Sequence, residues 1–278
     1  MSVLQVGLVD TTGALDVELV QAVAAALNIQ VTRDLPQFWP VQATVRYLSS
    51  AQKIPLGVWP VQLVRHLPPH EGGFHLDKHN QPYAKVLASP NNDGWTIAAS
   101  HETIEMLVDP YGNKQQTSTA IDIVNGQIQD GPGEFAYLVE ACDPCEADNY
   151  AYAIQGVAVS DFITPHFYDP VAAVGTRYSF TGALTKPRQI LPGGYISWVN
   201  PVSDEWQQLQ YFDKPQIVDL GPAEHHKSMR EWTHTKRDAR LGAHVISEHP
   251  KNLRLLEQCK KQREMLNHAA LKRAALYQ

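Results

Sequence analysis

Features that define several large classes of proteins are missing from this 278-residue chain. It has no run of 18 apolar residues, and its best candidate, residues 17–31, is interrupted by Glu18, Gln21, Asn28 and Gln30, so we expect no transmembrane helix. The first residues lack a basic segment, so we expect no secretory signal. Three cysteines are too few to suggest the disulfide framework of a secreted protein. Together these absences predict a cytoplasmic protein.

Motifs for nucleotide binding and for nucleophilic catalysis are also missing. The pairs Gly72-Gly73 and Gly193-Gly194 do not match the phosphate-cradling patterns, and no nucleophile elbow or catalytic Cys/His pair is evident. Hydrophobic residues nevertheless make up 44% of the chain, enough for a core that needs neither disulfides nor metal. These observations indicate a globular protein whose chemistry lies in other residues.

Charge divides the chain into two parts. Residues 223–278 hold twelve basic and six acidic side chains, a net charge of +6, whereas residues 1–222 carry −12. We therefore expect a main domain over 1–222 and a basic helical extension over 223–278, which docks on the acidic body, on a second subunit or on a partner protein. Nucleic acid is not favoured as the partner, because acids are interspersed among the bases and no stacking platform is evident.

Hydrophobic patterning predicts strands and helices in both halves of the chain. The expected strands are 3–9, 41–48, 58–67, 83–89 and 152–159, with a hairpin at 195–199 and 207–212. Helices are expected over 16–27 and 95–108, the second ended by Asp109-Pro110. The polar stretch 111–133 is interpreted as a long excursion, and the basic extension as two helices separated around 242–250.

The most informative segment is the second of these helices, which carries His101-Glu102-Thr103-Ile104-Glu105. Residues four apart share a helix face, so His101 and Glu105 can bind one metal ion. Glu102 lies roughly a quarter-turn away, at ~100° per residue. The alternative is an amphipathic helix with an ordinary solvated acidic face.

This segment resembles the zincin metallopeptidases, whose active-site helix carries His-Glu-x-x-His. The resemblance implies an α+β fold with a zincin-like mixed sheet, a metal ligand at His101 and a general base at Glu102. It also implies that strand 83–89 is the edge strand that aligns a peptide substrate. Glu105 stands where the usual motif has histidine. In this respect the chain is similar to a group of bacterial zincin-like proteins in which His-Glu-x-x-Glu is followed by a downstream Glu-x-x-Asp-x-Cys.

Here the downstream element is Glu140-Ala141-Cys142-Asp143-Pro144-Cys145. We expect Glu140 to be the third ligand, with Asp143 or Asp109 supporting His101 or competing as a ligand. One imidazole and two carboxylates neutralise the charge of a divalent ion. The ion is then a weaker Lewis acid than one held by three histidines. Zinc is the first choice of metal, with manganese or calcium as alternatives.

Other residues carry weaker signals. His166, or alternatively Tyr168, is a candidate hydrogen-bond donor opposite the base, although a packed or turn residue is the plainer interpretation of each. The Cys142-x-x-Cys145 pair is compatible with a redox or structural-zinc role, but buried thiols beside the site are the preferred interpretation.

The sequence thus supports two hypotheses about function. The first is a zinc-dependent peptidase that acts on a peptide or protein substrate, with Glu102 as the general base for water attack. The second is a catalytically retired zincin-like protein that acts in binding or assembly through its basic C-terminal helices.

Overall fold

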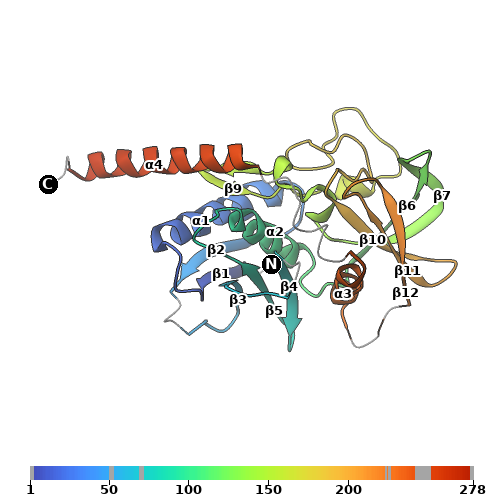
Figure 1. Ribbon diagram of the computed structural model, residues 1–278, viewed down its shortest axis with the longest axis horizontal. Coiled ribbons are helices and arrows are strands. Elements are labelled where there is room, and N and C mark those ends of the chain that lie inside the picture. The colour runs from blue at the N-terminus through green and yellow to red at the C-terminus, as the bar shows by residue number, and fades with distance from the viewer. Residues whose placement is uncertain are drawn as a thin grey trace.

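The computed structural model describes residues 3–49, 53–68, 72–222, 224, 227–241 and 252–275 (Figure 1). The chain has an α+β fold that ends in a long helix, which confirms the expected fold class. Two five-stranded sheets form the body. Residues from both sheets share one continuous buried core.

The first sheet is mixed, with the order β2-β1-β3-β5-β4. Its strands are β1 (Leu4–Asp10), β2 (Ala43–Leu48), β3 (Val58–Val64), β4 (Gly73–Lys78) and β5 (Gln81–Leu87). The first four in this order are parallel, and β4 is an antiparallel edge strand. The prediction that residues 83–89 form the edge was wrong, because β5 pairs with β3 on one side and β4 on the other. His79 and Asn80, both at positive φ, make the tight turn that adds β4.

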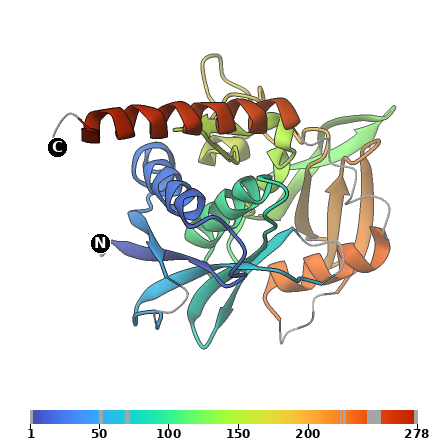
Figure 2. The same cartoon turned by 60° about the vertical axis from the view of Figure 1, so that its left-hand side comes forward.

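Two helices cover one face of this sheet (Figure 2). The first, α1 (Val17–Ile29), begins where Asp16 accepts a hydrogen bond from the Glu18 backbone amide, and it buries Val20, Val23 and Leu27. A π-helical turn (Gln30–Asp34) and a 3₁₀ turn (Leu35–Gln37) continue it. The second helix, α2 (Trp95–Val108), has the bounds expected from the sequence. It lies beside β4 and β5 at the edge of the sheet.

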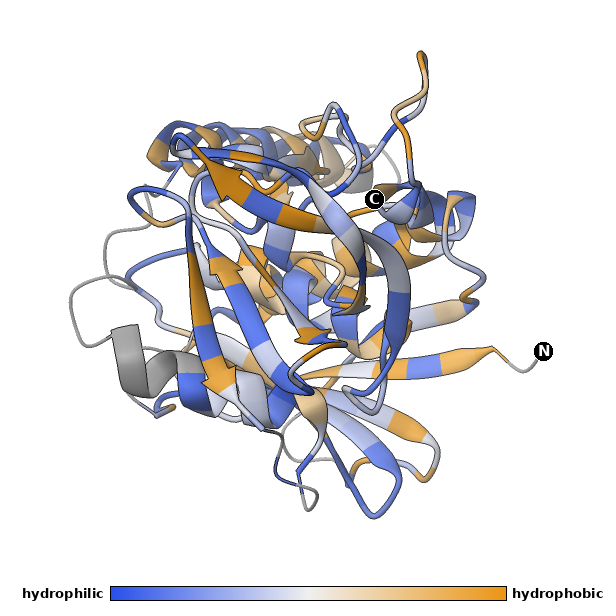
Figure 3. Cartoon of the chain, turned by 90° about the vertical axis from the view of Figure 1, so that its right-hand side faces the viewer, coloured by the Kyte–Doolittle hydropathy of each residue, from blue (hydrophilic) through white to orange (hydrophobic). Residues whose placement is uncertain are grey.

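The second sheet is antiparallel, with the order β12-β11-β10-β7-β6 (Figure 3). Its strands are β6 (Gln115–Val124), β7 (Gln127–Leu138), β10 (Tyr195–Asn200), β11 (Glu205–Gln210) and β12 (Gln216–Gly221). The polar excursion expected over 111–133 was wrong, because this stretch forms most of the β6–β7 hairpin. Asn125 and Gly126, both at positive φ, form its two-residue turn.

Short elements lie between β7 and β10, two strands of the second sheet. They are a 3₁₀ turn at Asp143–Cys145, another at Asp148–Tyr150, the hairpin of β8 (Tyr152–Ile154) and β9 (Val157–Val159), and a 3₁₀ turn at Pro165–Tyr168. The first of these turns follows β7 after residues 139–142. It brings the acidic element at 140–145 against α2, where the backbone amide of Cys142 donates to Glu105.

The basic extension forms two helices, α3 (Met229–Leu241) and α4 (Leu253–Ala275). The expected break at 242–250 lies outside the described residues. Helix α3 packs on the second sheet, with Trp232 buried in a cluster that also contains Leu138, Trp206 and Leu220. Its first turn joins the chain after α2, because the Arg230 amide donates to the Gly112 carbonyl over 3.0 Å. Part of the predicted extension is therefore seated within the body.

Helix α4 rests on the body by its first half. Leu256 and Cys259 are buried against Ile97 and Ala158, and Arg263 donates a hydrogen bond to the Gly156 carbonyl over 2.6 Å. Farther along, Met265, Leu266 and Leu271 are exposed, and the helix projects beyond the rest of the molecule (Figure 1). The first half of α4 thus docks on the protein's own body, one of the three surfaces expected for the basic extension.

Candidate metal centre

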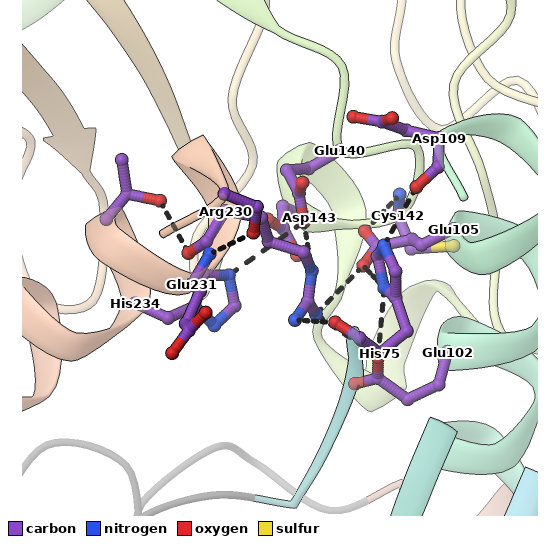
Figure 4. Close-up of polar contacts among 12 residues, drawn as sticks. His75, Glu102, Glu105, Asp109, Glu140, Cys142, Asp143, Arg230, Glu231 and His234 are labelled. Atoms are coloured by element: carbon purple, nitrogen blue, oxygen red, sulfur yellow. Dashed lines mark hydrogen bonds and ion pairs between the residues drawn. The ribbon is translucent and has the colours of Figure 1, made fainter. Parts of the chain in front are cut away.

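The polar face of α2 is buried, contrary to the interpretation of an ordinary solvated acidic face. The Glu105 side chain has no exposed surface, that of Glu102 is 5% exposed and that of His101 is 12% exposed. The edge strand β4, the segment after β7 and helix α3 enclose this face (Figure 4). Because an unpaired charge is costly to bury, the acids on this face must be paired with cations or take up protons.

Two side chains of α2 meet a third from the 3₁₀ turn at Asp143–Cys145. The Nε2 atom of His101 lies 3.2 Å from Glu105 Oε2 and 3.2 Å from Asp143 Oδ1. The other Glu105 oxygen, Oε1, accepts a hydrogen bond from the Cys142 amide over 3.0 Å, which fixes the carboxylate and leaves Oε2 facing His101. The Cys142 sulfur also lies within 4.8 Å of ligand atoms of His101 and Glu105. One imidazole and two carboxylates therefore converge at this point.

Glu140 takes a different position from the one expected. Its Oε2 atom accepts a hydrogen bond from Arg230 Nε over 2.8 Å and lies 3.8 Å from His234 Nε2. The structure brings Asp143 next to His101 and holds Glu140 on the α3 side of the cluster. Sequence reasoning assigned Glu140 as the third ligand and Asp143 as the competitor; the contacts favour the reverse order.

Arg230 is the cation at the centre of the cluster. Its side chain is 2% exposed, and Nη2 lies 3.1 Å from Glu102 Oε2 and 3.4 Å from Glu105 Oε2. Its Nη1 donates to the carbonyl of His75 on β4. The guanidinium thus links three glutamates with the edge strand. Burial opposes the charge on Arg230, but the carboxylates of Glu140, Glu102 and Glu105 hold its pKa well above its ordinary value.

His75 completes the cluster on the side of β4. Its Nδ1 atom lies 3.4 Å from Glu102 Oε2, and its Nε2 lies 3.2 Å from the backbone carbonyl of Asp109. Burial lowers the pKa of this imidazole, and the nearby Arg230 adds to that effect. His75 is therefore neutral at pH 7, and one of its ring nitrogens can donate a proton while the other accepts one.

Three expected site residues lie elsewhere or act differently. The Asp109 carboxylate accepts the Lys114 amide over 2.7 Å and so closes the turn after α2 rather than supporting His101. The His166 side chain is 55% exposed and pairs with Asp169 at 2.8 Å, and none of its contacts with described residues is in the cluster. Tyr168 is buried instead, and burial with the neighbouring Glu140 charge raises its pKa.

The cysteines are free thiols, and Cys142 and Cys145 are both buried. Burial, with the nearby carboxylates, raises the pKa of each thiol well above its ordinary value. Reactive thiols need a lowered pKa and partial exposure. The environment thus favours packed thiols over a redox pair.

Charge in the cluster is unbalanced without a further cation. Four buried carboxylates, those of Glu102, Glu105, Glu140 and Asp143, surround the single guanidinium of Arg230 in the described part of the chain. Burial raises the pKa of Asp143 to about 6, and the Glu105 charge adds to it. Burial opposes the charge on His101, but Glu105 and Asp143 raise its pKa well above the ordinary value.

These shifts mean that protons compensate part of the negative charge. Three carboxylate oxygens, both of Asp143 and Oε1 of Glu140, accept no hydrogen bond from any described residue. A divalent cation held by His101, Glu105 and Asp143 fits this donor set, because its charge would compensate carboxylates that otherwise rely on protons and on Arg230.

A pocket of about 190 Å³ opens beside the cluster, between β4 and α3. Its wall includes Phe74 and Leu76 from the edge strand and Arg230 and His234 from α3. The cluster is therefore reached from the free side of β4, where the strand has no neighbour in the sheet.

Sequence reasoning missed His75, Arg230 and His234. The first two contact α2 directly, and the third contacts Glu140. His75 and Arg230 are buried, but they come from an alternating edge strand and from a helix rich in charge, and neither local pattern indicates burial. The one available signal was the net charge of −12 on residues 1–222, which favours pairing with basic residues of 223–278.

No protein-family model, curated protein or solved structure matches this chain. In the part of the chain that the structure describes, no helix is both long and apolar enough to span a membrane.

Proposed function

We propose that this chain is a metal-dependent peptidase of zincin type. The observation that carries the proposal is the convergence of His101 and Glu105 with Asp143. The residue after His101 in α2 is a buried glutamate, Glu102. Zinc is the metal that imidazole ligands and these helix positions favour, with manganese as the alternative. When bound, a divalent ion polarises a carbonyl and acidifies water.

Glu102 is the residue suited to move protons in this reaction. Its Oε2 faces His75 and Arg230, so one oxygen of the carboxylate is held in place while the group remains beside the ligand residues. A fixed carboxylate can take a proton from water and pass it to the leaving amine. Arg230 adds a fixed positive charge in a water-poor site, where negative charge develops during amide hydrolysis.

The edge strand β4 suits a peptide substrate. It is antiparallel to β5, and among the described residues no strand pairs with its other side. An extended peptide can pair with such an edge through main-chain hydrogen bonds. Arg230 holds the carbonyl of His75, so a peptide would pair with β4 beside this residue, whose ring lies against Glu102.

One observation supports a non-catalytic alternative. Arg230 already contacts Glu102, Glu105 and Glu140, so much of the cluster is paired without a metal ion. A zincin-like protein that has lost catalysis and acts in binding would keep such a salt-bridge network.

The test combines metal analysis with a proton-transfer variant. Purified protein is loaded with zinc, dialysed and assayed on a quenched fluorescent peptide library. Glu102→Gln is expected to stay folded and keep its metal while losing hydrolysis, and the exposed Glu134→Gln serves as the control that stays active. Full hydrolysis by Glu102→Gln would reject the proposed proton transfer, and metal-free folded protein with no hydrolysis would support the binding alternative.

A further inference from the structure

A second set of ligand atoms lies next to the first and shares one residue with it. Glu140, Asp143 and His234 each offer an atom within 4.8 Å of the other two. These residues come from the segment after β7 and from α3 (Figure 4). Asp143 also lies 3.2 Å from His101, so its carboxylate stands between the two sets.

Unpartnered oxygens point to a ligand at this second position. Asp143 has no exposed surface, and neither of its oxygens accepts a hydrogen bond from a described residue. Glu140 is 3% exposed, and its Oε1 atom likewise has no hydrogen-bond partner. Buried carboxylate oxygens without a donor are expensive, since such groups are ordinarily satisfied by protein, water or an ion. Because Asp143 Oδ1 faces His101 Nε2 at 3.2 Å, the oxygens that point most clearly to a bound cation are Asp143 Oδ2 and Glu140 Oε1.

The two sets have the same chemical composition. Each joins one imidazole with one glutamate, and both use Asp143. Each glutamate also has one oxygen held by the protein: the Cys142 amide donates to Glu105 Oε1, and Arg230 Nε donates to Glu140 Oε2.

The imidazole of the second set faces Glu140 through its Nε2 atom, and its side chain is 12% exposed. The Tyr195 hydroxyl lies 3.2 Å from the same nitrogen, so an ion bound at Nε2 would replace this contact. The carboxylates are therefore arranged as ligands on both sides of Asp143.

The charge of the cluster is compatible with a second ion. The four carboxylates and Arg230 carry a net charge of −3, and one divalent ion leaves the buried cluster at −1. A second divalent ion makes the excess positive, a charge that suits water ionisation and anionic groups of a substrate.

We propose that the cluster binds two divalent transition-metal ions, one at His101, Glu105 and Asp143 and the other at Glu140, Asp143 and His234, with the Asp143 carboxylate bridging them. This inference rests on the proposed function, because it takes the first site as a metal site. Bridged ions in hydrolases lie about 3.5–4 Å apart and together hold the attacking and leaving groups. Arg230 then acts as a positioning residue that holds Glu140 Oε2 and leaves Oε1 for the second ion.

Metal stoichiometry of the full chain tests this proposal. Metal-free protein is titrated with Zn²⁺ by calorimetry, and the bound metal is counted by native mass spectrometry. Wild type is expected to bind two equivalents, His234→Ala one and His101→Ala one. Asp143→Asn is expected to weaken both. His166→Ala, a histidine outside the cluster, is the matched control and should keep two.

Two further measurements keep the proposal refutable if a variant is unstable. Glu140→Gln preserves the size of the side chain and an acceptor for Arg230, and it is expected to lose one equivalent. Wild type loaded with Mn²⁺ is expected to show the electron paramagnetic resonance spectrum of an exchange-coupled pair rather than that of isolated ions.

The two proposals fail in different ways. One equivalent in wild type, retained by His234→Ala and Glu140→Gln but lost in His101→Ala, would overturn the second site and leave the first. No bound metal in wild type would overturn both.

Discussion

Replacing Arg230 with methionine removes the guanidinium that contacts Glu102, Glu105 and Glu140, while keeping an apolar side chain of similar length. Arg230 is 2% exposed and lies within hydrogen-bonding distance of Glu102, Glu105 and Glu140. Removing one partner of a buried ion pair costs about 3–5 kcal/mol, because the remaining charge is left uncompensated. Since native proteins are stable by about 5–15 kcal/mol, Arg230→Met is expected to unfold at a much lower urea concentration.

The assay is urea unfolding of metal-free protein, repeated with saturating zinc. The destabilisation is expected to be smaller with zinc, because the ion supplies positive charge to the same carboxylates and binds the native state. Zinc affinity at His101, Glu105 and Asp143 should also rise in the variant, since the guanidinium no longer competes for Glu105. Arg46→Met, on an exposed position of β2, is the control and should change stability by no more than about 0.5 kcal/mol. A loss below about 1 kcal/mol in metal-free Arg230→Met would refute this reasoning.

Two further predictions concern the site itself. An alanine Cβ at Gly73 would lie 2.8 Å from Glu102 Cγ, so Gly73→Ala is expected to displace this side chain and lower kcat/KM for peptide hydrolysis by about 10–100-fold. Gly72→Ala is the control and should keep its activity, because a Cβ there meets nothing within 4 Å. Equal activity in the two variants would contradict the placement of Glu102. Zinc affinity is expected to fall as the pH drops through about 6, because protons compete for Asp143, whose pKa is raised to about 6, and for His101, whose pKa is also raised. Calorimetry between pH 5 and pH 8 measures this, and an affinity that is constant over the range would contradict it.

Local patterns predicted the central helix well. The apolar spacing and the Asp109-Pro110 stop gave both ends of α2, and the four-residue spacing placed His101 beside Glu105, as the structure shows. These features depend on residues close in sequence. The β6–β7 hairpin was also accessible, since Asn125-Gly126 is a strong signal for a two-residue turn, but the polar composition of its strands obscured it.

The remaining parts of the cluster depend on tertiary packing. Arg230 reaches Glu102 across 128 positions of sequence, and its helix looks from its composition like a solvated, basic element. The choice between Glu140 and Asp143 turns on the direction of the chain after β7, because the 3₁₀ turn at Asp143–Cys145 sends one carboxylate toward His101 while Arg230 holds the other. No periodicity in the sequence encodes that difference.

The most direct test of the account is a crystal structure of zinc-loaded protein with anomalous diffraction recorded on both sides of the zinc absorption edge. The account predicts a zinc peak within about 2.0–2.2 Å of a His101 nitrogen and of Glu105 and Asp143 oxygens. Protein crystallised with zinc that shows no peak at these three residues, and in which Arg230 remains the only cation among the carboxylates, would contradict it.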